Sequence, residues 1–340
     1  MTAQPIQFLM WDEPHAKELA GRIAAEAGFS PSGEWHPRVK SLRCGSREYG
    51  CQRLGVWPRQ DFVRVGPLFF LEDSHYGRLS PALRESLGAN AVRIADLNGS
   101  ILARWLGDFT IASAACMLGC DFAGRHVVDA GAGDGILSLV ALKLGAASAD
   151  LIDLDREALG RAKINLRLNG FSEQKQFHLI NGDLKNPDAV ADRLTRSSLP
   201  AAVVSNIGCW EYDVTNVDSM LLMDLVPTAD LFIGGGYSTR ALGGLRHMKN
   251  DERLLGLLGF APKAAAELDL GAAVYWPMPE KIAAMSAARP SGVIPSRPEI
   301  RKELEAQRTK VSNRLRVRFY KAAPAVVIAI LILMLYALFR

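Results

Sequence analysis

The sequence is poor in the residues that build metal centres and disulfide frameworks. Its 340 residues include five cysteines and six histidines. The cysteine spacings match no zinc or disulfide pattern, and Cys116 and Cys120 fall in an apolar segment, where two buried thiols are the simplest interpretation. We therefore expect no metal site and a reducing, cytoplasmic compartment.

Basic charge is missing from most of the chain, although the formal net charge is +4. Residues 297–340 hold ten Lys or Arg and three Asp or Glu, so the rest of the chain has a small acidic excess. A body of this kind excludes a broad nucleic-acid surface. We expect no nucleic-acid partner.

The N-terminus lacks a secretory signal, because its apolar run is short and no basic region precedes it. The other end differs: residues 322–339, AAPAVVIAILILMLYALF, are apolar, Pro or Tyr throughout. Eighteen helical residues rise about 27 Å, close to the hydrocarbon thickness of about 30 Å. A buried helix usually keeps a polar stripe, and this segment has none. The sequence predicts a transmembrane helix over 322–339.

Basic residues flank this segment unequally. Arg314, Arg316, Arg318 and Lys321 precede it, and only Arg340 follows. The positive-inside tendency then places the body of the protein in the cytoplasm, and the basic cluster should attract anionic headgroups. We expect a single-pass membrane protein whose partner is the membrane, with a membrane complex as a further candidate partner.

Strand and helix patterns alternate from residue 100 to residue 280. The expected strands are 126–130, 149–153, 176–181, 201–207 and 229–234, followed by two runs close enough to form an antiparallel hairpin, 261–269 and 272–276. The expected helices are 101–118, 135–144, 156–169, 187–197, 216–226 and 250–258. This alternation predicts an α/β fold with a doubly wound, mainly parallel, seven-stranded Rossmann-like sheet.

The flanking regions are less regular. Residues 1–99 contain a helix pattern over 14–27 and a strand-like run over 61–71, and we interpret them as a separate substrate-recognition region or a cap. Residues 281–298 hold three prolines and read as a linker. Residues 299–321 read as a basic helix leading to the membrane.

The most informative stretch is 129-DAGAGDG-135, in which Gly131, Gly133 and Gly135 follow an apolar strand that ends in Asp129. Glycines there let a ligand approach the backbone, and the next helix offers free N–H groups. A dinucleotide fingerprint would need glycine at position 136, which is isoleucine. An acid at the strand end would repel a pyrophosphate and could hold a cation. S-adenosylmethionine fits this pattern better, and a dehydrogenase is disfavoured.

Further acids follow the next two strands. Asp153, in 151-LIDLD-155, ends the expected strand 149–153 and can accept both ribose hydroxyls, with Asp155 as the alternative. Asp183, in 181-NGD-183, can accept a hydrogen bond from an adenine amino group. Carboxyl ends of adjacent strands are where an open α/β sheet binds its ligand. The sequence predicts one site there.

The motifs DAGAGDG, LIDLD and NGD resemble those of the class I S-adenosylmethionine-dependent methyltransferases. Over residues 100–280 the chain is most similar to the lysine methyltransferases of a large-subunit ribosomal protein. The resemblance implies S-adenosyl-L-methionine as cofactor. It also implies cofactor-binding residues: Asp129, Gly131 and Gly133 at the methionine end, Asp153 at the ribose, Asp183 at the adenine, and Asp108, Thr110 and Asn206 around them.

The methyl acceptor is expected at 205-SNIGCWEYD-213, after the fourth strand. In amine-methylating relatives an Asn-Pro-Pro-Tyr sequence or an Asn-Ile variant stands here, and Asn206 matches the asparagine. Its carbonyl can hold an amine. Ile207 and Gly208 replace the prolines, which disfavours an adenine or glutamine acceptor.

The rest of this segment supplies four more candidates. Trp210 or Tyr212 can form an aromatic wall, and Glu211 or Asp213 can take the amine proton. With Asn206, the residues Trp210 and Glu211 are the predicted catalytic set. We interpret the chain as a membrane-tethered methyltransferase that N-methylates a protein amine of the lysine type. Two alternatives stay open: a small or lipid-soluble acceptor, and a methyltransferase-like structural or assembly subunit of a membrane complex.

Overall fold

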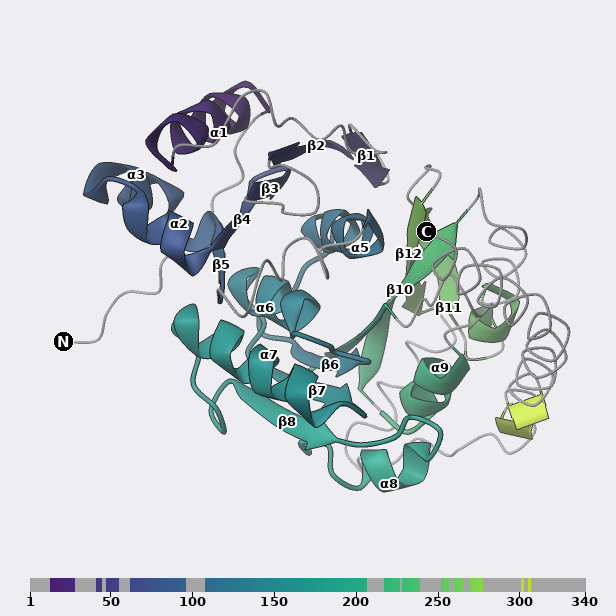
Figure 1. Ribbon diagram of the computed structural model, residues 1–340. Coiled ribbons are helices and arrows are strands. Elements are labelled where there is room, and N and C mark those ends of the chain that lie inside the picture. Colours follow the sequence, from purple (N-terminus) through teal and green to yellow (C-terminus); the bar gives the residue numbers. More distant parts are fainter. Residues whose placement is uncertain are drawn as a thin grey trace, which may run out of the picture.

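The computed structural model describes the chain in segments: residues 13–27, 41–44, 47–54, 62–95, 108–206, 217–226, 228–238, 252–256, 258, 260–265, 270–277, 301–302 and 305–306. Within them lie two sheets (Figure 1). The larger sheet has the strand order β11-β12-β10-β9-β6-β7-β8. Its strands are β6 (His126–Ala130), β7 (Ser148–Asp153), β8 (Phe177–Asn181), β9 (Ala201–Ser205), β10 (Ala229–Ser238), β11 (Phe260–Ala265) and β12 (Leu270–Pro277).

The strand pairing makes this sheet doubly wound. From the central strand β6 the chain runs outward through β7 and β8, then returns to β9 on the other side of β6, and all these neighbours pair in parallel. Only β12 runs against its neighbours β10 and β11. The strand order reverses between β6 and β9, and sheets of this kind bind ligands at the carboxyl ends of the strands beside such a reversal. The predicted fold class and the closing hairpin are confirmed.

Helices cover both faces of the larger sheet. One face packs against α5 (Asp108–Leu118), α6 (Ile136–Lys143) and α7 (Arg156–Leu168), and the other against α8 (Pro187–Ala191) and α9 (Val217–Asp224). Successive strand residues serve opposite faces: Val127 joins the first cluster and Val128 the second. Burial on both sides explains the continuous apolar runs of these strands. The helix expected over 187–197 is shorter in the structure and ends at Ala191.

The N-terminal region forms the second sheet, in the order β1-β2-β3-β4-β5. Its strands are antiparallel except for the pair β4 and β5. The bounds are α1 (Glu13–Ala27), β1 (Ser41–Cys44), β2 (Arg47–Leu54), β3 (Phe62–Val65), β4 (Leu68–Glu72), α2 (Asp73–Arg78), α3 (Pro81–Leu87), a 3₁₀ turn η2 (Gly88–Asn90) and β5 (Ala91–Ile94). The run expected over 61–71 is two strands, because Gly66 turns the chain with φ +52°.

This second sheet is packed onto the domain that contains the larger sheet. Phe62 and Phe69 face the core formed with α1 and α3, whereas Val63 and Phe70 belong to the same core as α5 and α6. Helix α5 therefore lies between the two sheets (Figure 1). A shared core of this kind joins the N-terminal sheet to the element that precedes β6.

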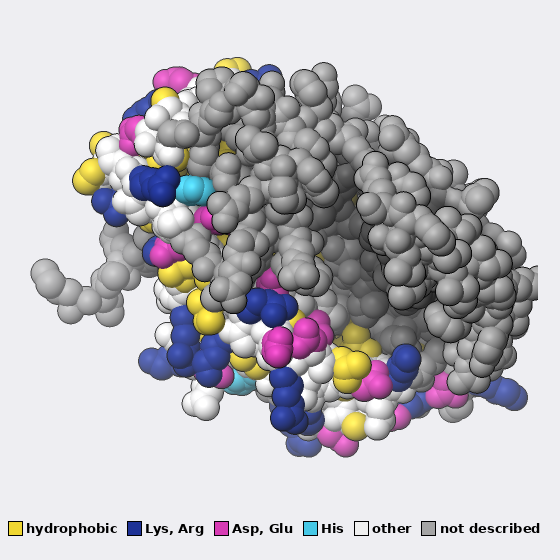
Figure 2. Space-filling model, viewed as in Figure 1, with side chains coloured by type: hydrophobic (Ala, Val, Ile, Leu, Met, Phe, Trp, Pro, Cys, Tyr) yellow, Lys and Arg dark blue, Asp and Glu magenta, His cyan; other side chains and the backbone are white. Residues whose placement is uncertain are grey.

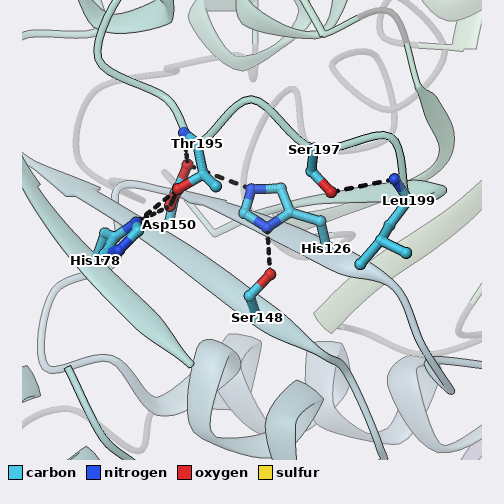
Figure 3. Close-up of polar contacts among 7 residues, drawn as sticks. All are labelled: His126, Ser148, Asp150, His178, Thr195, Ser197 and Leu199. Atoms are coloured by element: carbon cyan, nitrogen blue, oxygen red, sulfur yellow. Dashed lines mark hydrogen bonds and ion pairs between the residues drawn. The ribbon is translucent and has the colours of Figure 1, made fainter. Parts of the chain in front are cut away.

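A polar cluster lies toward the amino ends of the strands, centred on Asp150 (Figure 3). Asp150 is fully buried, and its carboxylate accepts hydrogen bonds from Thr195 N at 2.6 Å and Thr195 Oγ1 at 2.7 Å. His126 Nε2 and His178 Nδ1 each lie 3.3 Å from it. His126 Nδ1 also meets Ser148 Oγ at 2.8 Å. We name these five residues the amino-end cluster.

The C-terminal region is described only at four positions. Arg301 donates to both carboxylate oxygens of Asp188, in α8, and also contacts Glu305. Among the residues that the structure describes, no helix is long and apolar enough to cross a membrane. The predicted transmembrane segment 322–339 lies outside the described residues, as do the linker 281–298 and most of 299–321.

Candidate functional site

The glycine loop, residues 131–135, joins β6 to α6 at the carboxyl edge of the larger sheet. Gly131 N and Ala132 N both donate to Ile152 O at 2.9 Å, which holds the loop against the end of β7. Gly131, Gly133 and Gly135 all have positive φ, at 75°, 53° and 76°. Residues with a side chain rarely adopt positive φ, so the conformation of the turn requires glycine at these three positions.

The last two glycines have different reasons to lack a side chain. A Cβ atom at Gly135 would lie 2.8 Å from Ala162 Cβ and 3.0 Å from Leu151 Cδ2, so Gly135 permits α6 and α7 to pack closely. At Gly133 a Cβ atom would meet no heavy atom of the described residues within 4 Å. The space beside the backbone is therefore open at Gly133, and a ligand can approach the backbone there.

Asp153 ends β7 and points at this loop. Its Oδ2 accepts a hydrogen bond from Gly133 N at 2.7 Å, and its Oδ1 accepts one from Asp155 N at 2.9 Å. A carboxylate has about four lone-pair positions, so both oxygens can accept further donors. Asp155 instead caps α7 by accepting from Glu157 N at 2.8 Å. The geometry favours Asp153 over Asp155 as the ligand-facing acid.

Asp129 lies deeper than the sequence suggested. It is 1% exposed, and its Oδ2 accepts from Ser138 N at 3.0 Å and Ser138 Oγ at 2.8 Å. Gly135, the residue that begins α6, has no capping side chain, so Asp129 supplies the acceptor for that helix end. Burial raises the pKa of Asp129 to about 7, against the lowering effect of the Ser138 bonds. Asp129 is therefore a support beneath the loop and does not lie at an open mouth.

Asp134 fastens the loop to α7. It is 5% exposed, and its Oδ1 accepts from Arg161 Nε at 2.7 Å. Burial raises the pKa of Asp134, although the hydrogen bond and charge of Arg161 oppose the shift. Its Oδ2 is buried and has no hydrogen-bond partner among the described residues. Neither Asp134 nor Arg161 was among the predicted site residues.

Asp183 follows the neighbouring strand. Gly182 N donates to Asp153 O at 3.0 Å, so the ends of β7 and β8 lie side by side. Asp183 is exposed and accepts from Lys185 N through Oδ1 at 2.9 Å. Leu154, between the acids Asp153 and Asp155, is 70% exposed. An exposed apolar side chain beside these acids offers an apolar contact for a heterocyclic ring. The sequence did not lead us to predict Leu154 as a site residue, although its position between two acids could have indicated it.

Asn206 follows β9 on the other side of β6. Its Nδ2 donates to Thr110 Oγ1, in α5, at 3.2 Å, which joins two predicted site residues that are 96 positions apart. Its Oδ1 is buried and has no hydrogen-bond partner among the residues described. Burying a carbonyl oxygen without a donor is costly, so this atom is suited to accept from a ligand.

The structure thus gathers most of the predicted residues at one edge of the sheet. Gly131, Gly133, Asp153 and Asp183 surround the ends of β6, β7 and β8, with Asp129 below, and Asn206 and Thr110 follow at β9 and α5. Asp108 begins α5, and its side chain is not described. The predicted catalytic residues Trp210 and Glu211, with Tyr212 and Asp213, lie outside the described residues.

The electrostatics of this edge are acidic. The charge of Asp153 raises the pKa of Asp129 after the effect of burial, and the charges of Asp155 and Asp153 act on Asp134 in the same direction. Elsewhere Asp and Glu side chains lie beside Lys and Arg side chains on the described part of the surface in view (Figure 2). Among the described residues no group of three His, Cys, Asp or Glu is arranged to hold a metal ion. The edge favours a ligand that carries positive charge.

Comparison with protein families places a match in this region. The family model described as "Ribosomal protein L11 methyltransferase" matches residues 115–207, well under half of the chain. Those residues contain the glycine loop, Asp153, Asp183 and Asn206. The match excludes the N-terminal sheet and α5 up to Ala114.

Curated relatives bear the same description. The protein of Serratia proteamaculans is 30% identical over 146 residues, which are 43% of this chain and 40% of that protein. The protein of Enterobacter sp. is 32% identical over 168 residues, 49% of this chain and 47% of the relative. The chain therefore spans less than half the length of these relatives.

A solved structure, the ribosomal protein L11 methylase of Lactobacillus delbrueckii subsp. bulgaricus, is 17% identical and covers 62% of this chain and 94% of its own, with a TM-score of 0.43. That score adds nothing to the strand order described above. The sequence matches confirm the prediction of an S-adenosylmethionine-dependent methyltransferase domain for the matched segment: residues 115–207 are similar to the ribosomal protein L11 methyltransferases.

Proposed function

We propose that this chain is an S-adenosyl-L-methionine-dependent methyltransferase that transfers a methyl group to a protein amine of the lysine type. One observation carries the proposal. The open backbone at Gly133, held by Asp153, and the carbonyl of Asn206, which has no partner among the described residues, follow the strands that flank the reversal of the sheet. The first is suited to a cofactor and the second to an acceptor.

The residues present fit the proposed cofactor. Gly131 and Gly133 expose backbone, Asp153 can accept the ribose hydroxyls, and Asp183 can accept from the adenine amino group. Leu154 offers an apolar contact to the adenine ring. Asp129 would support the loop from beneath at the methionine end, through its bonds to Ser138. When bound, S-adenosylmethionine supplies a methyl group on a sulfonium, which reacts with a neutral amine.

The acceptor side depends on Asn206. Its Oδ1 can accept a hydrogen bond from an N–H of the amine and so direct the nitrogen lone pair toward the methyl group. Thr110 fixes the orientation of the amide by accepting from Nδ2. Orientation of this kind can supply about 7–11 kcal/mol of a reaction barrier. The amine must lose a proton, and we assign that role to Glu211 or Asp213, with Trp210 or Tyr212 as an aromatic wall.

A protein acceptor is favoured over a small one for two reasons. The relatives that match are named for methylation of ribosomal protein L11, a protein substrate. In this chain the N-terminal sheet shares a core with α5, which carries Thr110, so a surface for recognising a protein is joined to the acceptor side of the site.

We also propose that residues 322–339 tether the enzyme to a membrane, with the catalytic domain in the cytoplasm. The apolar length of the segment and the basic residues before it support the tether. Such a tether raises the local concentration of acceptors at the membrane surface.

Calorimetric titration of the purified full chain with S-adenosylmethionine tests the cofactor. We expect micromolar binding that Asp153→Ala abolishes. Asp155→Ala is the matched control, because it removes the cap of α7 at a cost of about 1 kcal/mol and leaves the ligand-facing acid in place. A folded wild-type protein that does not bind would favour the structural-subunit alternative.

Deletion of residues 322–340 tests the tether. We expect the wild-type chain to sediment with membranes and the shortened chain to stay in the supernatant. If the shortened chain still sediments with membranes after a high-salt wash, the tether lies elsewhere.

A further inference from the structure

Helix α7 carries a buried asparagine that touches two separate parts of the molecule. Asn165 is 0% exposed. Its Nδ2 donates to the backbone carbonyl of Asp134, in the glycine loop, at 3.0 Å, and its Oδ1 accepts from Ala95 N, just after β5, at 2.9 Å. We propose that Asn165 is a positioning residue that couples the N-terminal sheet to the cofactor loop.

Two residues of α7 hold the glycine loop, and both bind Asp134. Arg161 binds the side chain of Asp134, and Asn165 binds its main chain. Asp134 lies between Gly133 and Gly135, and three glycines leave the loop with little rigidity of its own. The position of Gly133, where the ligand approaches, is therefore set by contacts that come from α7.

The N-terminal sheet is held by the same helix, one turn further on. Asn169 Oδ1 accepts from Arg93 N at 3.0 Å, and Asn169 Nδ2 donates to Arg93 O at 2.6 Å. Asn169 Nδ2 also donates to Asn165 O at 2.8 Å. The two asparagines thus anchor β5 together, but only Asn165 also reaches the glycine loop.

This difference makes a coupling specific to Asn165. When the amide of Asn165 is fixed by Ala95 N, its Nδ2 is aimed at Asp134 O, and displacement of either partner changes the bond to the other. A protein that binds the N-terminal sheet would then alter cofactor affinity, and the cofactor would alter the affinity for that protein by the same factor. This consequence rests on the proposed function, whereas the contact between loop and sheet does not.

The test compares Asn165→Ala with Asn169→Ala in the full chain. Both remove a side-chain amide that anchors β5, so both should increase amide hydrogen exchange in β5. We expect only Asn165→Ala to increase exchange at Gly131–Gly135, and to weaken S-adenosylmethionine binding by about fivefold or more. Equal effects of the two variants on the glycine loop would overturn the coupling and leave a merely structural role.

Two further measurements keep the test decisive. If Asn165→Ala does not fold, exchange in the wild-type chain replaces it: saturating S-adenosylmethionine should protect Ala95 as well as the glycine loop, and protection confined to the loop would overturn the proposal. If the wild-type chain does not bind the cofactor, the proposed function fails, and exchange at Gly131–Gly135 in the two variants still decides the coupling.

Discussion

Asp150 and Asp129 are buried carboxylates on the adjacent strands β7 and β6, one register position apart and on opposite faces of the sheet, and their surroundings differ. Asp150, in the amino-end cluster, accepts two bonds from Thr195 and faces His126 and His178. In the described part of the chain, Asp129, beneath the glycine loop, accepts from the two donors of Ser138 alone. Burial raises the pKa of both acids; around Asp150, His126 and Thr195 outweigh it and lower the pKa, whereas at Asp129 the pKa stays raised, at about 7.

The difference distinguishes a cluster that stabilises the fold from an edge that is suited to bind a ligand. The amino-end cluster satisfies its buried acid fully, as a structural element should. At the carboxyl edge, Asp134 Oδ2 and Asn206 Oδ1 are buried without partners among the residues described, and Gly133 opens onto free space. Unsatisfied polar atoms cost stability in the free protein, and a ligand can recover that cost on binding.

The largest effect is expected at the amino-end cluster. Asp150→Ala leaves the Thr195 and His126 groups without their acceptor, and loss of one partner from a buried ionic network costs about 3–5 kcal/mol. Urea unfolding should show this loss, while the folded fraction keeps its cofactor affinity. If cofactor affinity fell as much as stability, the cluster and the ligand-binding edge would not be independent.

Two glycines of the glycine loop should respond differently to substitution: Gly135 mainly in stability and Gly133 mainly in cofactor binding. Gly135→Ala places a methyl group 2.8 Å from Ala162 Cβ, and overpacking costs about 1–3 kcal/mol, in addition to the strain of positive φ. Gly133→Ala has only the strain, about 1–2 kcal/mol, but fills the ligand's approach. We expect the first to lower the melting temperature more and the second to weaken cofactor binding more. Identical profiles would refute the assignment of open space to Gly133.

The smallest effect is a pH dependence of opposite sign at the two acids. The raised pKa of Asp129 means that the native state keeps its proton longer, so this group's contribution is full below the ordinary pKa of 3.8 and is lost as pH rises through about 7. Asp129→Asn should therefore gain stability relative to wild type between pH 5 and pH 8, by about 1 kcal/mol or more. Its Oδ1 can still accept from Ser138.

The lowered pKa of Asp150 gives the matching control. Its contribution is present above the unfolded pKa and is lost as pH falls through the folded value. The deficit of Asp150→Asn should therefore shrink in acid, whereas the gain of Asp129→Asn should vanish there. Unfolding curves at several pH values measure both, and parallel pH profiles would contradict the comparison.

The sequence was sufficient to predict the larger sheet and the place of its site. Strands buried on both faces give continuous apolar runs, and the carboxyl ends of parallel strands must meet at one edge. That is why Asp153 and Asp183, separated by 30 positions, could be assigned to one site before the strands were seen to lie side by side.

The N-terminal sheet was harder to predict, because its pattern is irregular and one pairing is non-local. Arg64 interrupts the apolar run of β3 but is only 1% exposed, with NH1 donating to Gly66 O at 3.1 Å. Strand β5 pairs in parallel with β4 across two intervening helices. Neither a buried arginine nor a parallel pairing has a short-range signal.

Within the site, the sequence could not predict how deeply each residue is buried or which residues it contacts across the fold. Asp129 was expected at the mouth because it ends a strand, and its burial depends on how α6 covers that end. Asn165 and Asn169 are four residues apart, a spacing that is common among polar residues on the exposed face of a helix. Their partners, Ala95 and Arg93, come from another sheet, so only the fold could identify them.

The amide of Asn169 binds the N–H and the C=O of Arg93 together, as a peptide group of a neighbouring strand would. Strand β5 is the last strand of its sheet, and exposed edges of this kind invite addition of a strand from another chain. Side chains from α7 occupy those groups instead. The asparagines therefore protect this edge against edge-to-edge aggregation.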